Sequence, residues 1–320
     1  MSKLYLQKKI VVIGGGTGVF TVLTGLRKYF SDLTAVVTMS DDGGSTGILR
    51  EEFGILPPGD VRRSLVALAR TDNEILSHLF NYRFEEGAGL NGHSFGNLML
   101  IALERLTGGF DKAIKEAAKI LSVQGQVLPV TLKSAKLYAE LDNGKIIKGE
   151  NNIDVPKHDG SFGIKKIWLK PQAVVNPEVA DAILKADAIL IGPGDLYTRL
   201  IPNLLVKGMN EVLKKTRAKK IYFVNVMTKY GETHGFRASD FLKILEQYLG
   251  KGILDFVVVN TKKPGWSRIK NYVQEKAELV EFDKENFASQ PTVITADLLR
   301  PKGLVRHDSD KIASLIKMIL

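Results

Sequence analysis

Five short runs of hydrophobic residues, rich in β-branched side chains, are spaced along the chain and predict the strands of a buried sheet. They cover residues 9–13, 33–39, 186–194, 220–228 and 255–261. Most positions within each run are apolar, with little alternation, and this pattern is typical of parallel strands that are covered on both faces.

Between and after these runs, apolar residues recur at helical spacing. Such stretches cover about 17–30, 61–69, 73–84, 96–107, 110–121, 201–215, 238–249 and 308–319. Pro57 and Pro58 stop the chain before the second stretch, and Asp60 is expected to cap the helix there. Alternation of strands and helices predicts an α/β fold with a mostly parallel sheet and helices on both faces.

One region has a different pattern. Residues 127–169 alternate between apolar and polar side chains, with a turn at Asp142-Asn143-Gly144. This alternation predicts β-hairpin material inserted into the α/β framework. Because no repeat or linker divides the chain, we expect a single domain over residues 1–320 with a β-rich insertion at about 127–169.

The amino-acid composition excludes several classes of protein. The 320 residues are 44% hydrophobic and 25% charged and include no cysteine, which excludes disulfides and cysteine-based metal sites. No apolar run is long enough for a membrane span, and residues 1–9 lack the apolar segment of a signal peptide, so a cytoplasmic location is expected. The net charge of +10 is spread over short segments. It favours a solvated lysine surface over nucleic-acid binding, and it suits an anionic ligand such as a phosphate ester.

The first predicted strand ends in the glycine loop Gly14-Gly15-Gly16-Thr17-Gly18. Gly14 and Gly16 match the dinucleotide pattern G-x-G-x-x-G, but Val19 replaces its third glycine, and no Walker Gly-Lys-Ser/Thr follows. Backbone N–H groups of such a loop, at the start of a helix, attract a phosphate. Tight packing of the strand against the helix explains the glycines equally well.

A second loop, SDDGGSTGILR, follows the second predicted strand. Asp41 and Asp42 stand where a ribose is contacted in doubly wound folds, and adjacent carboxylates also suit a magnesium ion. An ordinary Gly/Asp turn is the alternative. The loop has more polar and glycine residues than a strand-to-helix connection needs, which favours a functional role.

A third loop, IGPGDLYTRLIPNLL, ends another apolar run. Gly192, Pro193 and Gly194 set an unusual backbone path there. Two interpretations stay open: a second phosphate or sugar subsite, and a plain helix cap made by Asp195 or Thr198.

The five histidines show no metal-ligand spacing. His93, with Ser94 and Asn97 in NGHSFGN, is a candidate phosphate donor or general acid. The plain alternative is a hydrogen bond at a helix entry, with Asn91 or Ser94 as the cap. A hydrolase triad is unsupported, because the chain has neither a readable Ser/His/Asp order nor a G-x-S-x-G elbow.

Taken in order, eight motifs resemble those of the YvcK-type gluconeogenesis factor family, which is related to the CofD-like phospholactate transferases. They are IGGGTGVF, SDDGGSTGILR, LPPGDVRRSLVALA, YRF, GHSFGNLML, GPGDLYTRLIPNLL, NVMTKYGETHGF and RHDSDKIA. Each motif alone is weak, but the series covers nearly the whole chain.

The resemblance implies a Rossmann-like fold and a nucleotide site. Transferase relatives bind a guanosine diphosphate-linked phospholactate with magnesium. The YvcK-type branch binds UDP-sugars, notably UDP-N-acetylglucosamine, and supports cell shape and cell-wall precursor supply during gluconeogenic growth. It therefore implies a cytoplasmic regulator with a protein partner in that metabolism, and we expect a homo-oligomer.

The resemblance also implies which residues contact the ligand. They are Gly14, Gly15, Gly16, Thr17, Gly18, Asp41, Asp42, Gly43, Gly44, Ser45, His93, Ser94, Asn97, Gly192, Gly194, Tyr197, Asn225, Thr228, Tyr272 and Arg306. Asp41 and Asp42 would hold a magnesium ion if one is used. For Arg306, a surface ion pair with Asp308 or Asp310 is the plain alternative.

Three departures from the family pattern bear on the ligand. Asp195 replaces a common serine, Arg199 replaces a small polar residue, and Lys229-Tyr230 stands where the family has Gln-Pro. We expect the Asp195 carboxylate to repel a pyrophosphate unless Arg199 or a metal ion offsets it.

Three functions follow for the sequence. The first is a nucleotide-sugar-binding regulator, favoured by the C-terminal motifs and by the lack of a readable nucleophile. The second is a magnesium-dependent transferase of the CofD type, in which Asp41 and Asp42 hold the ion. The third, an NAD-dependent oxidoreductase, is disfavoured by Val19.

Overall fold

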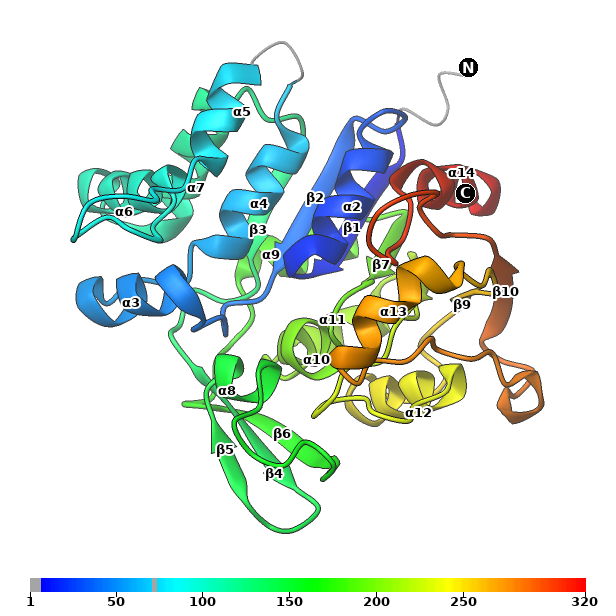
Figure 1. Ribbon diagram of the computed structural model, residues 1–320. Helices are drawn as coiled ribbons and strands as arrows, with labels where there is room; N and C mark the ends of the chain where they lie inside the picture. Colours follow the sequence, from blue (N-terminus) through cyan, green and yellow to red (C-terminus); the bar gives the residue numbers. More distant parts are fainter. Residues whose placement is uncertain (1–6, 71–73) are drawn as a thin grey trace.

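A sheet of seven parallel strands forms the centre of the molecule, in the order β10-β9-β8-β7-β1-β2-β3 (Figure 1). The computed structural model describes residues 7–70 and 74–320, without the side chain of Asn271. The strands are β1 (Lys9–Gly14), β2 (Asp32–Val37), β3 (Gln126–Pro129), β7 (Ala188–Ile191), β8 (Lys219–Phe223), β9 (Phe256–Asn260) and β10 (Thr292–Ala296).

The strand order reverses at β1. From there, β2 and β3 extend to one side, and β7 to β10 extend to the other. Connections between parallel strands of one sheet are right-handed as a rule, and this rule places the helices of the two halves on opposite faces of the sheet. At the reversal, Ile13 of β1 lies between Val36 of β2 and Ile191 of β7.

The helices confirm the predicted α/β class. They are α2 (Gly16–Leu26), α3 (Gly44–Phe53), α4 (Gly59–Leu68), α5 (Glu74–Asn81), α6 (Phe95–Thr107), α7 (Phe110–Ile120), α8 (Glu150–Asp154), α9 (Pro177–Leu184), α10 (Ile201–Leu204), α11 (Met209–Lys215), α12 (Ala238–Leu249), α13 (Trp266–Gln274) and α14 (Ser309–Ile319), with a π-helical turn η1 (Leu196–Leu200) and a 3-10 turn η2 (Lys284–Asn286). Residue 73 of one predicted helix and residues 1–6 lie outside the described residues. Within the described ranges, no helix is long and apolar enough to cross a membrane.

A second, small sheet stands apart from the large one. It contains β4 (Lys136–Leu141), β5 (Ile146–Lys148) and β6 (Ile164–Lys170) in the antiparallel order β5-β4-β6. The predicted turn between β4 and β5 is confirmed, because Gly144 has a φ of +80° and donates its N–H to Leu141 at 2.8 Å. The predicted region 127–169 thus covers the small sheet and also most of β3, which pairs with β2 in the large sheet.

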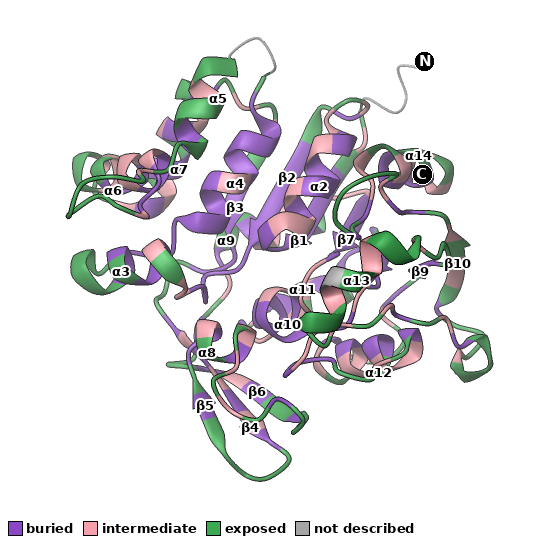
Figure 2. Ribbon diagram, viewed as in Figure 1, coloured by how far each residue is buried: buried purple, intermediate pink, exposed green. Residues whose placement is uncertain are grey.

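The core follows the predicted strands. In β1, Val12 and Ile13 are fully buried, and β7 is buried along its whole length. Figure 2 shows this burial concentrated in the large sheet and in the helices that cover it. Strands β7 and β8 end at Ile191 and Phe223, earlier than the apolar runs predict. The residues that follow each strand form loops at the carboxyl edge of the sheet.

Two predictions about local structure are wrong. The segment SDDGGSTGILR is not a long loop, because α3 begins at Gly44. Burial of Leu49 against Ile55 and Ile101 outweighs the low helix propensity of the glycines. Asp60 does not cap α4 either: the N-cap is Pro58, and Asp60 lies inside the first turn.

Helix α14 packs against α2 at Gly25. A Cβ atom on Gly25 would lie 2.0 Å from the backbone oxygen of Ser309. We predict that Gly25→Ala destabilises the fold, because overpacking of this kind costs about 1–3 kcal/mol and exceeds the gain of about 1 kcal/mol in helix propensity. Urea unfolding checks this, with Gly89→Ala as the control, since no atom lies within 4 Å of a Cβ there. Equal stability of the two variants would contradict the prediction.

Candidate functional site

A cleft of about 690 Å³ opens at the carboxyl ends of β1, β7 and β8. It is lined by residues 15–18, 21, 63, 154–156, 193–195, 199, 225–230, 272, 275, 277 and 305–307. This position is where the strand order of the sheet reverses. Open α/β sheets bind their ligands there, so the cleft is the candidate site.

Helix α2 begins in this cleft. Gly15 is its N-cap, and among the described residues no side chain caps the helix at that position. The first N–H groups of a helix have no partner within the helix, and they carry a partial positive charge. The turn that starts at Gly16, with Thr17 and Gly18, therefore presents an anion-binding end to the cleft.

Packing explains part of the glycine loop. A Cβ on Gly15 would lie 2.4 Å from Asp60 Oδ2, and a Cβ on Gly18 would lie 1.7 Å from the backbone oxygen of Pro193. Gly16 is different: its φ is +64°, and the nearest atom to an added Cβ belongs to Arg199, 3.8 Å away. The packing interpretation thus accounts for Gly15 and Gly18, whereas the positive φ of Gly16 favours glycine there, and Gly16 lines the cleft beside Arg199.

The loops after β7 and β8 are joined at the cleft wall. The N–H of Gly194 donates to Asn225 Oδ1 at 3.0 Å. Thr228 Oγ1 accepts from the N–H of Glu278 at 2.9 Å, and the Thr228 N–H donates to the Glu278 carbonyl at 2.7 Å. Asn225 and Thr228 therefore line the cleft and also fix the loops that form it.

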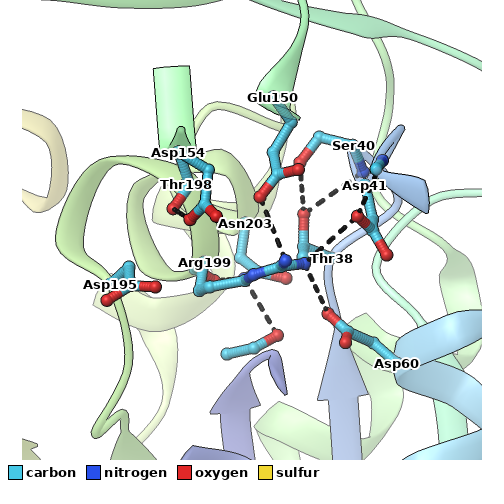
Figure 3. A network of polar contacts seen from close by, with 12 residues as sticks. Thr38, Ser40, Asp41, Asp60, Glu150, Asp154, Asp195, Thr198, Arg199 and Asn203 are labelled. Atoms are coloured by element: carbon cyan, nitrogen blue, oxygen red, sulfur yellow. Dashed lines mark hydrogen bonds and ion pairs between the residues drawn. The ribbon is translucent and has the colours of Figure 1, made fainter. Parts of the chain in front are cut away.

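The guanidinium of Arg199 lies among three carboxylates at the floor of the cleft (Figure 3). Nη1 is 3.2 Å from Asp60 Oδ2 and 3.7 Å from Asp41 Oδ1. Nη2 is 3.1 Å from Glu150 Oε1, a contact that lacks the alignment of a hydrogen bond. The three acids come from the segment after β2, from α4 and from α8, so Arg199 joins three separate parts of the chain to its own.

Burial dominates the electrostatics of these groups. It raises the pKa of Glu150 to about 9, although the charge of Arg199 opposes this shift. It also raises the pKa of Asp41. Burial alone would lower the pKa of Arg199, but the charges of Asp60, Glu150 and Asp41 outweigh it and hold that pKa above its ordinary value. Glu150 therefore carries a proton at neutral pH, and Arg199 stays charged.

The second loop does not fit a magnesium ion. Asp41 faces the guanidinium of Arg199, whereas Asp42 Oδ1 accepts a hydrogen bond from the N–H of Asn151 at 2.8 Å. The two carboxylates thus point to different partners. A cation beside Asp41 would also meet the positive charge of Arg199.

A second group of acids includes Asp154 and Asp195, which line the cleft. In the part of the chain that the structure describes, Asp154, Asp195 and Glu232 form the one group of acids close enough for a metal ion, with oxygens within 4.8 Å of one another. Lys229 Nζ pairs with Asp154 and lies 3.3 Å from Asp195 Oδ2 and 3.3 Å from Glu232 Oε1. Burial raises the pKa of Glu232 to about 8. It is therefore Lys229, and not Arg199, that offsets the carboxylate of Asp195.

Aromatic and basic side chains also line the cleft. The Tyr272 hydroxyl accepts a hydrogen bond from the N–H of Val305 at 3.1 Å, while the residue lines the cleft. Arg306 is exposed and lines it as well. Burial lowers the pKa of His307 to about 4, so its imidazole is neutral and adds no charge to the cleft at neutral pH.

The alternative role for Arg306, a surface ion pair with Asp308 or Asp310, is not observed. Asp308 caps α14 by accepting from the N–H groups of Asp310 and Lys311, and Asp310 pairs with Lys28. Within residues 7–70 and 74–320, the Arg306 side chain makes no ion pair with either aspartate. Its charge is therefore available to a ligand.

The motif NGHSFGN lies behind the cleft. Ser94 caps α6, which matches the plain interpretation of the motif, and Asn97 Oδ1 accepts from Arg62 Nε at 3.1 Å. His93 is buried beside them, and none of these three residues lines the cleft. Asn97 holds Arg62 of α4, whose neighbour Arg63 does line the cleft.

Other predicted site residues also lie outside the cleft lining. Tyr197 is buried, and its hydroxyl donates to the Ile164 carbonyl at 3.4 Å. Gly14, which ends β1, and Gly192, which precedes η1, are also outside the lining. So are the residues that follow β2: Asp41, Asp42, Gly43, Gly44 and Ser45. Gly15, Gly16, Thr17, Gly18, Gly194, Asn225, Thr228, Tyr272 and Arg306 are the predicted residues that the cleft brings together.

Sequence reasoning missed four charged residues of the site. Arg63 stands in a quoted motif, and its pairing with Arg62 next to a helix start was a usable signal. Lys229 was noted only as a departure from a family pattern. Glu232 stands in the quoted motif NVMTKYGETHGF, whereas Asp154 had no readable signal, because only the fold brings it to Lys229.

A family model, curated sequences and a solved structure all match this chain over most of its length. The family model described as 2-phospho-L-lactate transferase CofD matches residues 10–299. This chain is 44% identical over 319 residues to a putative gluconeogenesis factor of Nostoc sp., a match that covers 98% of this chain and 69% of that protein. It is 41% identical over 317 residues to the gluconeogenesis factor of Bacillus subtilis, covering 98% of each. A crystal structure of a UPF0052 family member from Bacillus halodurans has a TM-score of 0.92 and 42% identity, covering 97% of this chain and 99% of that one.

The raised pKa of Glu150 predicts a pH dependence of stability. The folded chain keeps a proton that the unfolded chain releases near pH 4.5, so stability falls as pH rises from there through about 9. Glu150→Gln removes this titration. We expect the wild type to lose about 1–2 kcal/mol more than this variant between pH 7 and pH 9, measured by urea unfolding. Glu211→Gln, at an exposed position of α11, is the control, and equal losses in all three proteins would contradict the prediction.

Proposed function

Because this chain belongs to the CofD family and, within it, to the gluconeogenesis factors, we propose that it binds a nucleotide sugar of the UDP-N-acetylglucosamine class and acts as a regulator. The regulated process would be the supply of cell-wall precursors and the maintenance of cell shape during gluconeogenic growth. This proposal assigns the cleft at the strand reversal to the ligand.

The start of α2 is the observation that carries this proposal. It supplies uncapped N–H groups to a cleft at the carboxyl edge of the sheet, and a diphosphate is the natural partner of such a helix end. Gly16 lines the cleft and has no side chain, so a phosphate can approach the backbone closely. Arg63 and Arg306 line the same cleft and supply further positive charge.

The remaining groups suit the two ends of a nucleotide sugar. The ring of Tyr272, held by the hydrogen bond to Val305, is placed to stack on a base. The carboxylates of Asp154 and Asp195 also line the cleft and can accept hydrogen bonds from sugar hydroxyls. We therefore place the base toward Tyr272 and the sugar toward these acids.

A binding role is favoured over catalysis by the state of the charged groups. Arg199 and Lys229 are both paired with carboxylates, and the paired acids are not free to act as bases. In the regulatory proposal, the liganded chain acts through a protein partner in wall-precursor metabolism. We further propose that it does so as a homo-oligomer in the cytoplasm.

The alternative is a transferase of the CofD type, which moves a phospholactyl-type group from a nucleotide diphosphate donor. The match to the CofD family model over residues 10–299 favours it. A magnesium ion would neutralise the donor's phosphates in such a reaction. Asp41 and Asp42 do not converge on one point, which weighs against this alternative.

Calorimetric titration with UDP-N-acetylglucosamine tests the proposal. We predict saturable binding with the sugar recovered intact, and a loss of affinity of about tenfold or more in Tyr272→Ala and in Arg306→Ala. Tyr272→Phe keeps the ring and loses only the hydrogen bond to Val305, so its affinity should stay within a few-fold of the wild type. Lys302→Ala, at an exposed position outside the cleft lining, is the charge control.

The titration also separates the alternatives. NAD serves as a negative control, and guanosine diphosphate serves as the probe for a transferase donor. Turnover of a guanosine diphosphate-linked donor, without binding of any UDP-sugar, would support the transferase and refute the regulator. Equal affinity of Tyr272→Ala and wild type for the UDP-sugar would refute the placement of the base.

A further inference from the structure

The carboxyl groups of Asp154, Asp195 and Glu232 are spaced like the ligands of a cation. Asp154 ends α8, Asp195 precedes η1, and Glu232 follows β8. Their carboxylate oxygens lie within 4.8 Å of one another. Oxygen ligands at 2.0–2.6 Å from a magnesium or calcium ion lie within about 5 Å of each other, so this spacing suits one divalent cation.

An ammonium already lies among these acids. Lys229 Nζ has three donors, and it contacts Asp154, Asp195 and Glu232. The Thr198 hydroxyl adds a hydrogen bond to Asp154 Oδ1 at 3.3 Å. The group therefore has both its positive charge and its hydrogen-bond donors supplied by the chain itself.

Local structure keeps the ammonium in place. Lys229 and Glu232 belong to one turn, in which the Glu232 and Thr233 N–H groups both donate to the Lys229 carbonyl. The side chain of Glu232 is 1% exposed, so its carboxyl cannot turn away to solvent. Burial alone would lower the pKa of Lys229, but the charges of Glu232, Asp195 and Asp154 outweigh it and hold that pKa above its ordinary value.

We propose that the Lys229 ammonium takes the place of a divalent cation in this cleft, so that the cleft binds its nucleotide ligand without a metal ion. The second half of this inference rests on the proposed function. The carboxylates of Asp41 and Asp42 also do not fit a magnesium site. A basic side chain lies beside each acid concerned: Arg199 beside Asp41, and Lys229 beside Asp195. Both observations support binding without a metal ion. The ligand's phosphates are then met by the start of α2 and by arginine side chains.

Manganese binding to the protein without nucleotide tests the first half. Free Mn²⁺ is measured by electron paramagnetic resonance during titration of the wild type and of Lys229→Ala. We expect no saturable site in the wild type and one Mn²⁺ per chain in Lys229→Ala, displaced by Mg²⁺. Addition of Asp195→Asn to Lys229→Ala should weaken this site by about tenfold or more.

Two variants control for general effects. Lys28→Ala removes a lysine that pairs with the single carboxylate of Asp310, so it should create no Mn²⁺ site. Lys229→Gln keeps hydrogen-bond donors for the acids without the charge, and it replaces Lys229→Ala if thermal unfolding shows that the alanine variant does not fold. A folded neutral variant at position 229 that binds no Mn²⁺ would overturn the proposal. So would a wild-type site that Asp195→Asn abolishes.

The second half is tested with UDP-N-acetylglucosamine in Mg²⁺ and in EDTA. Equal affinity in both buffers is expected, and a loss of about tenfold in EDTA would overturn metal-free binding. If no UDP-sugar binds in either buffer, the proposed function fails, and the Mn²⁺ titration still decides whether Lys229 excludes a divalent cation.

Discussion

The ion pairs of Arg199 are the interaction on which the cleft depends. Asp41 and Asp60 come from separate segments, and without the charge of Arg199 their carboxylates would repel one another in a buried environment. Breaking a buried pair by removing one partner costs about 3–5 kcal/mol, because a charge is left uncompensated. The position of Asp60 also explains why residue 15 must be glycine. The floor of the cleft and the turn that starts α2 are therefore fixed by one guanidinium.

The cleft has an uneven distribution of charge. Arg199 and Lys229 are neutralised within the protein, whereas Arg63, Arg306 and the start of α2 line the open space. An anion in the cleft thus meets the positive charge of these groups, whereas the acids that line the cleft are already paired with Lys229.

The amount that could be predicted from the sequence differs between the scaffold and the site. Continuous apolar runs such as the one ending at Ile191 predict buried parallel strands, and the glycine that follows predicts a loop at the sheet edge. Helix α3 was missed because its glycines hide a helix that is stabilised by tertiary burial of Leu49. The charge network was out of reach, since Arg199 and Asp60 are 139 residues apart and Lys229 and Asp154 are 75 apart. Only the fold brings such partners together.

Helix α8 connects the two charge clusters with the small sheet. Its first residue, Glu150, contacts Arg199, and its last residue, Asp154, pairs with Lys229. The helix follows β5 directly, so both charge clusters are connected to the small sheet through one five-residue helix. The position of the small sheet and the geometry of the cleft therefore depend on the same two cations.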